Sequence, residues 1–158
     1  MVVTTSNLYS ESRKVLKTLL DDNVIDPKTG NTNSNRRWVY REFPDTTSMD
    51  FSGYPIIVLS GASIDDNPED LQNYTSDGEF VFSLDIYAEF NDVNARIGSI
   101  SDNVHKTFRI RENQNELAEN GLYEVKLSSD GNDTTSVDNK LLSRRSFSIT
   151  VNATLEDC

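Results

Sequence analysis

Residues 80–90, FVFSLDIYAEF, alternate almost without fault between apolar and mostly polar side chains. The side chains on the apolar side are Phe80, Phe82, Leu84, Ile86, Ala88 and Phe90. A period of two places successive side chains on opposite faces of a β-strand. The segment therefore predicts a long strand with one wet face and one buried face, and the buried face needs a second layer to cover it.

The last third of the chain repeats this alternation and predicts a hairpin. Residues 123–127 alternate briefly, and residues 146–155 alternate over a longer run. The apolar side chains of the longer run are Phe147, Ile149, Val151, Ala153 and Leu155. Between the two runs, residues 128–140 are polar, so we expect them to form a flexible hairpin tip.

Two further segments predict strands by composition. Residues 37–43, RWVYREF, are β-branched and aromatic, and Pro44 ends them. Residues 54–59, YPIIVL, form a continuous apolar run, which is typical of a strand buried on both faces. Pro55 must lie at the start of that strand because it has no N–H to donate.

Two segments predict helices. Residues 7–22 carry an apolar stripe, and residues 93–109 carry a clearer one at spacings of four, three, four and four. The members of the second stripe are Val93, Ile97, Ile100, Val104 and Phe108. A short helical piece around 116–120 is expected to stop at Gly121.

The predicted order is α-β-β-β-α-β-β, without internal repeats or a linker. The simplest assembly is an α+β fold: a two-layer sandwich with a mostly antiparallel sheet of about five strands and both helices packed on one face. The length of 158 residues suits a single domain spanning residues 1–158.

Composition argues against several classes of function. The formal charge is −11, from 26 acidic and 15 basic residues. A general nucleic-acid binder needs a basic surface, so that class is disfavoured. We expect no signal peptide and no membrane-spanning segment. The single cysteine, Cys158, can form neither an internal disulfide nor a cysteine cluster for a metal.

The sequence offers little for catalysis. His105 is the one histidine and falls beside the apolar stripe of the second helix, so we interpret it as an ordinary boundary residue. Acidic residues gather at 65–70 and 130–138, but neither loop has the ligand spacing of a calcium site. We therefore expect a protein that is not an enzyme and has no catalytic residue, metal or cofactor.

Short basic groups stand out in this acidic chain and lie beside predicted strands. They are Arg36, Arg37, Arg41, Arg144 and Arg145. One interpretation is protection of sheet edges, where charge discourages stray strand pairing. The other is salt bridging to an acidic patch on a neighbouring subunit. The sequence leaves both open.

The order of elements resembles one known family. A first helix, a Pro-led apolar strand at 54–59, the alternating strand at 80–90, an immediate amphipathic helix at 93–108 and a closing hairpin at 122–156 cover nearly the whole chain. This order is similar to that of the tail terminator, or tail completion, proteins of long-tailed bacteriophages and related archaeal viruses. The strand-to-helix passage FVFSLDIYAEFNDVNARIGSISDNV carries most of the resemblance.

The resemblance implies a structural virion protein. Such proteins form a hexameric ring on the last ring of the tail tube, stop its polymerisation and face the head–neck connector, and DNA passes through without sequence-specific binding. The expected partners are other copies of the chain, the tube protein and the connector protein. The expected location is the head–tail junction of the virion, after assembly in the host cytoplasm.

The resemblance also suggests roles for two acidic groups. An acidic lining lets DNA slide, so the loop containing Asp65, Asp66, Glu69 and Asp70 is a candidate lumen-facing or neck-facing element. The hairpin tip, with Asp130, Asp133 and Asp138, is a candidate arm that reaches a neighbour or the tube. Rival interpretations are a head completion protein, a tail tube subunit, and a small monomeric protein-binding module.

Overall fold

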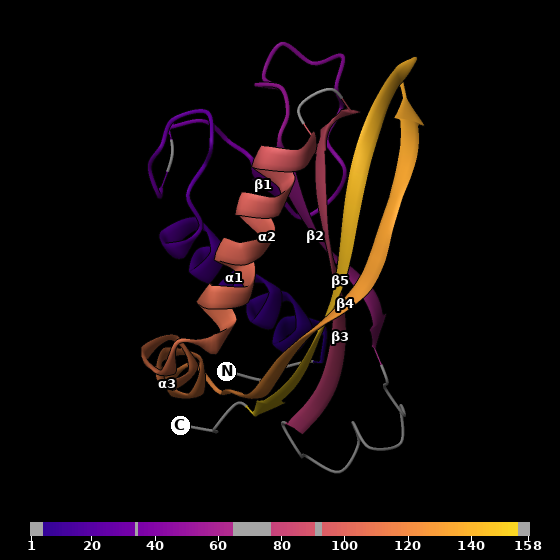
Figure 1. The fold of residues 1–158 in the computed structure, drawn as a ribbon. Coiled ribbons are helices and arrows are strands. Elements are labelled where there is room, and N and C mark those ends of the chain that lie inside the picture. Colours follow the sequence, from indigo (N-terminus) through magenta and orange to yellow (C-terminus); the bar gives the residue numbers. More distant parts are fainter. Residues whose placement is uncertain (1–4, 34, 65–76, 91–92, 155–158) are drawn as a thin grey trace.

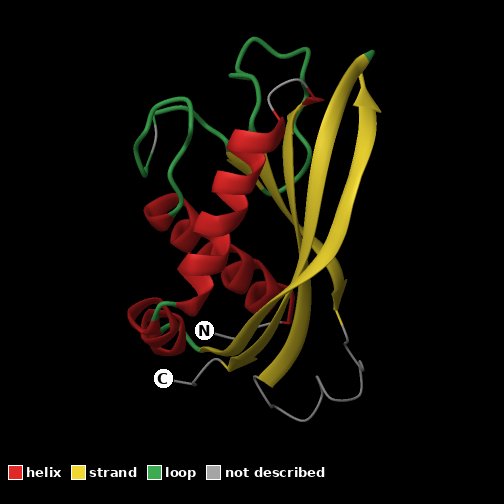
Figure 2. Cartoon of the chain, in the orientation of Figure 1, coloured by secondary structure: helices red, strands yellow, loops and turns green. Residues whose placement is uncertain are grey.

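The structure is a computed structural model that describes residues 5–33, 35–64, 77–90 and 93–154. Three helices form one layer and a five-stranded sheet forms the other, and the helices all lie on the same side of the sheet (Figures 1 and 2). The elements are α1 (Thr5–Asn23), β1 (Val39–Tyr40), β2 (Ile56–Ile64), β3 (Asp77–Glu89), α2 (Val93–Arg109), α3 (Arg111–Glu119), β4 (Leu122–Val137) and β5 (Lys140–Thr154). The predicted α+β class is confirmed.

Strand β3, which contains residues 80–89 of the alternating segment, is the centre of the sheet. The prediction is wrong at Phe90, which follows the strand and is 50% exposed. The strand order is β1-β2-β3-β5-β4. Strand β3 pairs antiparallel with β2 on one side and with β5 on the other, from Asp77 opposite Thr154 to Glu89 opposite Leu142. Among the strands that the structure describes, only β1 runs parallel to its neighbour, β2. The sheet is therefore mostly antiparallel, as predicted.

The main core lies between the helices and the sheet. The even-numbered side chains of β3 from Phe80 to Ile86 are fully buried there. The helices contribute Leu16 and Leu20 from α1 and Ile100 and Val104 from α2, each at 0% exposure. The apolar stripes of the sequence thus face the apolar side of the sheet, which accounts for the two-layer arrangement.

A second, smaller core covers part of the opposite sheet face. Ile57 and Leu59 of β2 point into the main core, whereas Ile56 and Val58 point into this second cluster. Its other members are Tyr40, Tyr54, Tyr87 and Leu142. Burial of β2 on both faces is thereby confirmed. The wet face predicted for residues 80–90 is wrong at Tyr87, because the chain after β1 folds over that end of the strand.

Residues 128–140, expected as a polar hairpin tip, are mostly paired strand, with one irregularity in the ladder between Ser129 and Gly131. Strands β4 and β5 stay paired up to Val137 opposite Lys140. The connection is the two-residue turn Asp138–Asn139, and both residues have positive φ, 49° and 62°. This is the geometry of a type I′ turn, whose twist matches the flanking strands. Hydrophobic alternation missed these strands because their cross-strand pairs here are polar.

Two other element boundaries differ from prediction. Strand β1 covers only Val39–Tyr40 of the expected 37–43, because the chain bends away at Arg41 to cross the outer face of the sheet. Helix α3 is longer than expected and begins just after Ile110, whose extended backbone (ψ 128°) ends α2. The side-chain amide of Asn113 donates to the Thr107 carbonyl (2.9 Å) and ties the two helices together.

Candidate functional site

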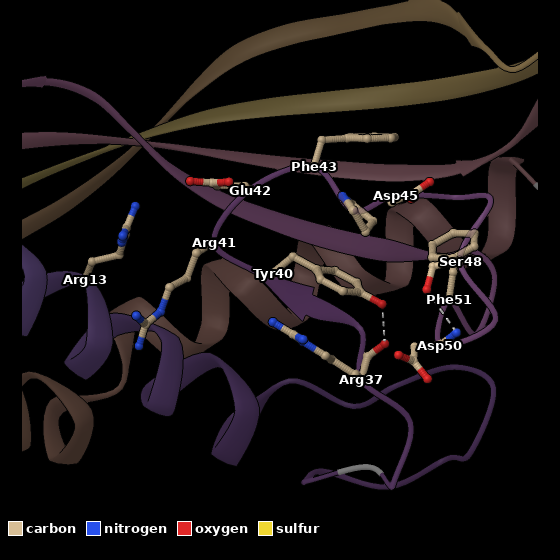
Figure 3. A pocket seen from close by; sticks show the side chains of 11 residues that line it. Arg13, Arg37, Tyr40, Arg41, Glu42, Phe43, Asp45, Ser48, Asp50 and Phe51 are labelled. Atoms are coloured by element: carbon tan, nitrogen blue, oxygen red, sulfur yellow. Dashed lines mark hydrogen bonds between the residues drawn. The ribbon is translucent and has the colours of Figure 1, made fainter.

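An open groove of about 530 Å³ lies beside β1 (Figure 3). Arg13 of α1 borders it on one side, and residues from Arg37 to Phe51 form the rest. We call this hollow the β1 groove. Its lining residues are Arg13, Arg37, Tyr40, Arg41, Glu42, Phe43, Pro44, Asp45, Ser48, Asp50 and Phe51.

The floor of the β1 groove is aromatic and well anchored. The Tyr40 hydroxyl donates to the Arg37 carbonyl (2.9 Å), and the Arg37 guanidinium lies 5.1 Å from the centre of the Tyr40 ring. Phe43 meets Tyr87 edge to face at 5.0 Å, and Phe51 meets Tyr54 at 5.3 Å. Edge-to-face pairs of this kind favour a fixed ring geometry, so the floor is preformed.

Short turns shape the far side of the groove. The Asp45 carboxylate accepts from the Thr47 hydroxyl (2.6 Å) and from the Thr47 backbone N–H (3.0 Å). These hydrogen bonds favour the charged form and hold the pKa of Asp45 below its usual value. The Ser48 and Phe51 amides then donate to the carbonyls of Asp45 and Ser48, which continues the turn toward β2.

Charges of both signs line the β1 groove. Figure 3 shows Arg13 and Arg41 toward one end, Asp45 and Asp50 toward the other, and Tyr40 between them. Within the described ranges, no carboxylate lies at ion-pair distance from Arg37 or Arg41. Glu42 lies at the arginine end and offsets part of its positive charge. The groove can therefore accept a polar surface that carries both signs of charge.

Arg36, which the sequence analysis offered as a subunit contact, makes its hydrogen bonds within the chain. Its side chain is only 8% exposed and makes two hydrogen bonds to the fully buried Asp26 carboxylate, at 2.9 and 2.7 Å. It also donates to the carbonyls of Gly53 and Pro55, at 2.8 and 2.9 Å. Arg36 thus joins the segment after α1 to the start of β2, and we no longer expect it to contact a neighbour.

The other basic pair and the predicted hairpin arm meet each other across β4 and β5. Arg144 makes a two-pronged contact with Asp133, at 2.8 and 2.5 Å, and Arg145 donates to the Asn132 side chain at 2.9 Å. The bonds to Asp133 and Tyr87 hold the pKa of Arg144 above its usual value. The prediction treated Arg144 and Asp133 as separate features, whereas the structure makes them one cross-strand pair.

Of the remaining acidic candidates, two have hydrogen-bond partners and the others lie outside the described residues. Asp130 accepts from the Ser148 hydroxyl, and Asp138 accepts from Thr46 in the loop that covers the outer face. Asp65, Asp66, Glu69 and Asp70 lie outside the described residues. His105 is half-buried, with its ring 5.2 Å from that of Phe147. Among the described residues, no three His, Cys, Asp or Glu side chains gather in a way that could hold a metal ion.

Comparison with known proteins leaves the family open. No protein-family model matches the chain. No curated protein matches its sequence. In the described part of the chain, no helix is both long and apolar enough to span a membrane.

Sequence reasoning missed most of the β1 groove because residues 44–53 read only as a loop. The structure shows that this loop carries Phe51 and two carboxylates into the groove wall. A usable signal was present: Phe43 and Phe51 are aromatic residues within an otherwise polar stretch. Aromatic side chains that flank a polar loop indicate that the loop packs against something rather than extending into solvent.

Proposed function

We propose that this chain is a tail terminator: a structural virion protein that caps the tail tube as a ring of six copies and meets the head–neck connector. The observation that supports it is the order of elements. The chain has an N-terminal helix, a Pro-led strand, a long alternating strand, an amphipathic helix directly after it, and a closing hairpin. This is the order on which the resemblance to tail terminators rests.

Two physical features are compatible with this role. The sheet ends in β4, a 16-residue strand that pairs only with β5 among the described residues, so its other edge can meet a neighbouring subunit. The chain also carries a formal charge of −11. A strongly acidic ring repels the phosphate backbone and lets DNA pass without sticking.

A monomeric protein-binding module is the second candidate. The β1 groove favours it, because an aromatic floor flanked by both signs of charge suits a protein partner. A tail tube subunit or a head completion protein remains a rival of the same structural class. Deletion of the protein should alter the virus particles in a different way for each of these candidates.

The test is deletion of the coding sequence from the genome that encodes the chain, followed by electron microscopy of the particles. A tail terminator predicts free heads together with tails of irregular, excessive length. Absence of all tails would indicate a tube subunit, and tails of normal length beside unjoined heads would indicate a head completion protein. Normal particles would overturn the virion proposal and favour the binding module.

A further inference from the structure

We infer that a pocket beside the distal part of the β4–β5 hairpin binds a single phosphate group, either free or carried on a small molecule. The pocket has a volume of about 300 Å³ and shares no lining residue with the β1 groove. Four hydrogen-bonding side chains of β4 and β5 line it, together with Ile97 of α2. We call this hollow the hairpin pocket. The inference does not depend on the proposed ring.

Two neighbouring cross-strand pairs place the four polar side chains of the hairpin pocket on one face of the sheet. Asn132 lies opposite Arg145, and Thr134 lies opposite Ser143. Residues two apart in a strand point to the same face, and directly opposite residues have Cβ atoms about 4.5–5.5 Å apart. Phe147, two residues beyond Arg145, is buried in the main core. The four side chains therefore form a compact group on the helix side of the sheet.

Ser143 is the buried donor of the hairpin pocket. Its side chain lines the pocket and is only 8% exposed, and its hydroxyl has no hydrogen-bond partner among the described residues. Buried hydroxyl groups normally have a partner. The hydroxyl of Thr134, across the ladder, also has no partner within the described ranges. A ligand oxygen in the pocket can accept a hydrogen bond from both hydroxyls.

Arg145 supplies the charge. Its Nε donates to the side-chain oxygen of Asn132 at 2.9 Å, which orients the guanidinium and leaves its terminal nitrogens available. The Asn132 amide nitrogen remains a further donor. In the part of the chain that the structure describes, no carboxylate lies at ion-pair distance from Arg145. Asp133 and Arg144 also border the pocket, but they neutralise each other at 2.8 and 2.5 Å.

This set of donors suits a phosphate group. The residues that line the hairpin pocket carry one uncompensated positive charge, so an anion is favoured over a cation. A guanidinium matches the geometry of phosphate oxygens and can bind two of them at once. The two hydroxyls and the amide donate from other positions on the ladder, which suits a tetrahedral group better than a planar carboxylate. The volume of about 300 Å³ leaves room for the rest of a small molecule.

The surroundings favour a small ligand over a nucleic acid. Binding a line of backbone phosphates takes several uncompensated cations, and the hairpin pocket offers only Arg145. The chain also carries a formal charge of −11, which repels a long polyanion over its whole length. A single phosphate group meets mainly the charges that line the pocket.

Titration of the ¹⁵N-labelled full chain with inorganic phosphate, followed by amide NMR at constant ionic strength, tests the inference. Saturable shifts should appear at residues 132–134 and 143–145, with a Kd on the order of 1 mM. Arg145→Gln should weaken binding at least about tenfold, because it removes the charged donor. Ser143→Ala should weaken it about threefold or more and leave the melting temperature unchanged, because the hydroxyl has no partner within the chain.

Arg109→Gln is the matched control. Arg109 is exposed at the end of α2, outside the hairpin pocket, and the substitution makes the same change in net charge. It should bind phosphate as the wild type does. A parallel titration with ribose 5-phosphate separates the two sources of the ligand. Tighter binding than inorganic phosphate indicates a phosphate carried on a small molecule, and equal binding indicates free phosphate.

Three results would overturn the inference. The first is the absence of saturable shifts in the hairpin pocket up to about 20 mM phosphate, a range that covers millimolar affinity. The second is an equal loss of binding in Arg109→Gln and Arg145→Gln, which would indicate a diffuse effect of net charge. The third is acetate binding as tight as phosphate binding, which would assign the pocket to a carboxylate. If Arg145→Gln melts early, normal phosphate binding by Ser143→Ala overturns it instead.

Discussion

Arg36 and Asp26 form an ion pair that the rest of the chain hides from water. Asp26 is fully buried and Arg36 nearly so, and the guanidinium also satisfies two backbone carbonyls ahead of β2. Removing one partner of such a pair leaves the other charge buried without compensation. The pair therefore holds the segment after α1 against the residues just before β2. Its role is to stabilise the fold rather than to contact another molecule.

Asp26→Asn should lower the free energy of unfolding by about 3–5 kcal/mol, because the Arg36 charge stays buried without its counter-ion. Urea unfolding followed by circular dichroism measures this. Asp21→Asn is the control, since Asp21 pairs with Lys17 at a partly exposed site (2.7 Å) and should cost less than about 1 kcal/mol. Equal losses of unfolding free energy in the two variants would contradict a special stabilising role for the buried Asp26–Arg36 pair.

We expect Tyr54 to make the stability of the protein fall in alkali. Burial, with smaller contributions from the charges of Asp138 and Glu89, raises the pKa of Tyr54 to about 12, against about 10 in an unfolded chain. Below pH 10 both states hold the proton, so stability there is unaffected. Between pH 10 and 12 the unfolded state loses the proton first, and stability falls as pH rises.

Tyr54→Phe should therefore flatten the loss of stability above pH 10 while leaving stability at pH 7 nearly unchanged. Urea midpoints measured at pH 7, 10 and 11 for the variant and the wild type give the comparison. Tyr123→Phe, at an exposed site, is the control and should behave as the wild type. If the urea midpoint of Tyr54→Phe falls as steeply as that of the wild type between pH 10 and 11, Tyr54 is not the source of the pH dependence.

At the scale of elements, α2 attaches the helical layer to the sheet. Ile100, at its middle, is fully buried in the main core. Ile100→Asp should unfold the chain or lower its melting temperature sharply, because a buried unpaired charge costs several kcal/mol. Ser99→Asp, on the exposed side of the same helix, should melt near the wild type. An unchanged melting temperature for Ile100→Asp would refute the packing of α2.

The β4–β5 turn is a second test at this scale. Asn139 has φ of 62°, a conformation that a β-branched residue adopts only under strain. Asn139→Val should cost about 1–3 kcal/mol of stability, whereas Asn139→Gly should be neutral or slightly stabilising. Urea unfolding of both variants measures the difference. Similar stabilities for the two would show that the turn is not of type I′.

The elements that sequence predicted well are those with a strong apolar period. The spacing from Val93 to Phe108 indicated α2, the alternation at 80–90 indicated β3, and the continuous run at 54–59 indicated the doubly buried β2. Sequence analysis did not predict the distal part of the hairpin, because its strands are held by polar pairs such as Arg144 with Asp133. The β1 groove escaped because it forms only when residues 41–53 fold back over the sheet.

At the scale of the whole molecule, several surface charges and one sheet edge are available for contact with other chains. The chain carries −11 overall, yet Arg37 and Arg41 have no carboxylate at ion-pair distance in the described ranges. In the same ranges, the exposed Glu112, Glu116 and Glu119 of α3 have no cation at that distance. Strand β4 keeps one edge open to its surroundings, again within the described ranges. These features suit a subunit that completes its surface against other chains, as the proposed ring requires.

The most direct test of the ring is the molar mass of the purified protein across a concentration series, with the main peak viewed by negative stain. The account predicts a species of six times the 17.8 kDa of one chain, seen as six-fold rings with a central hole. A species with the mass of one chain at every concentration, or long open tubes, would contradict it.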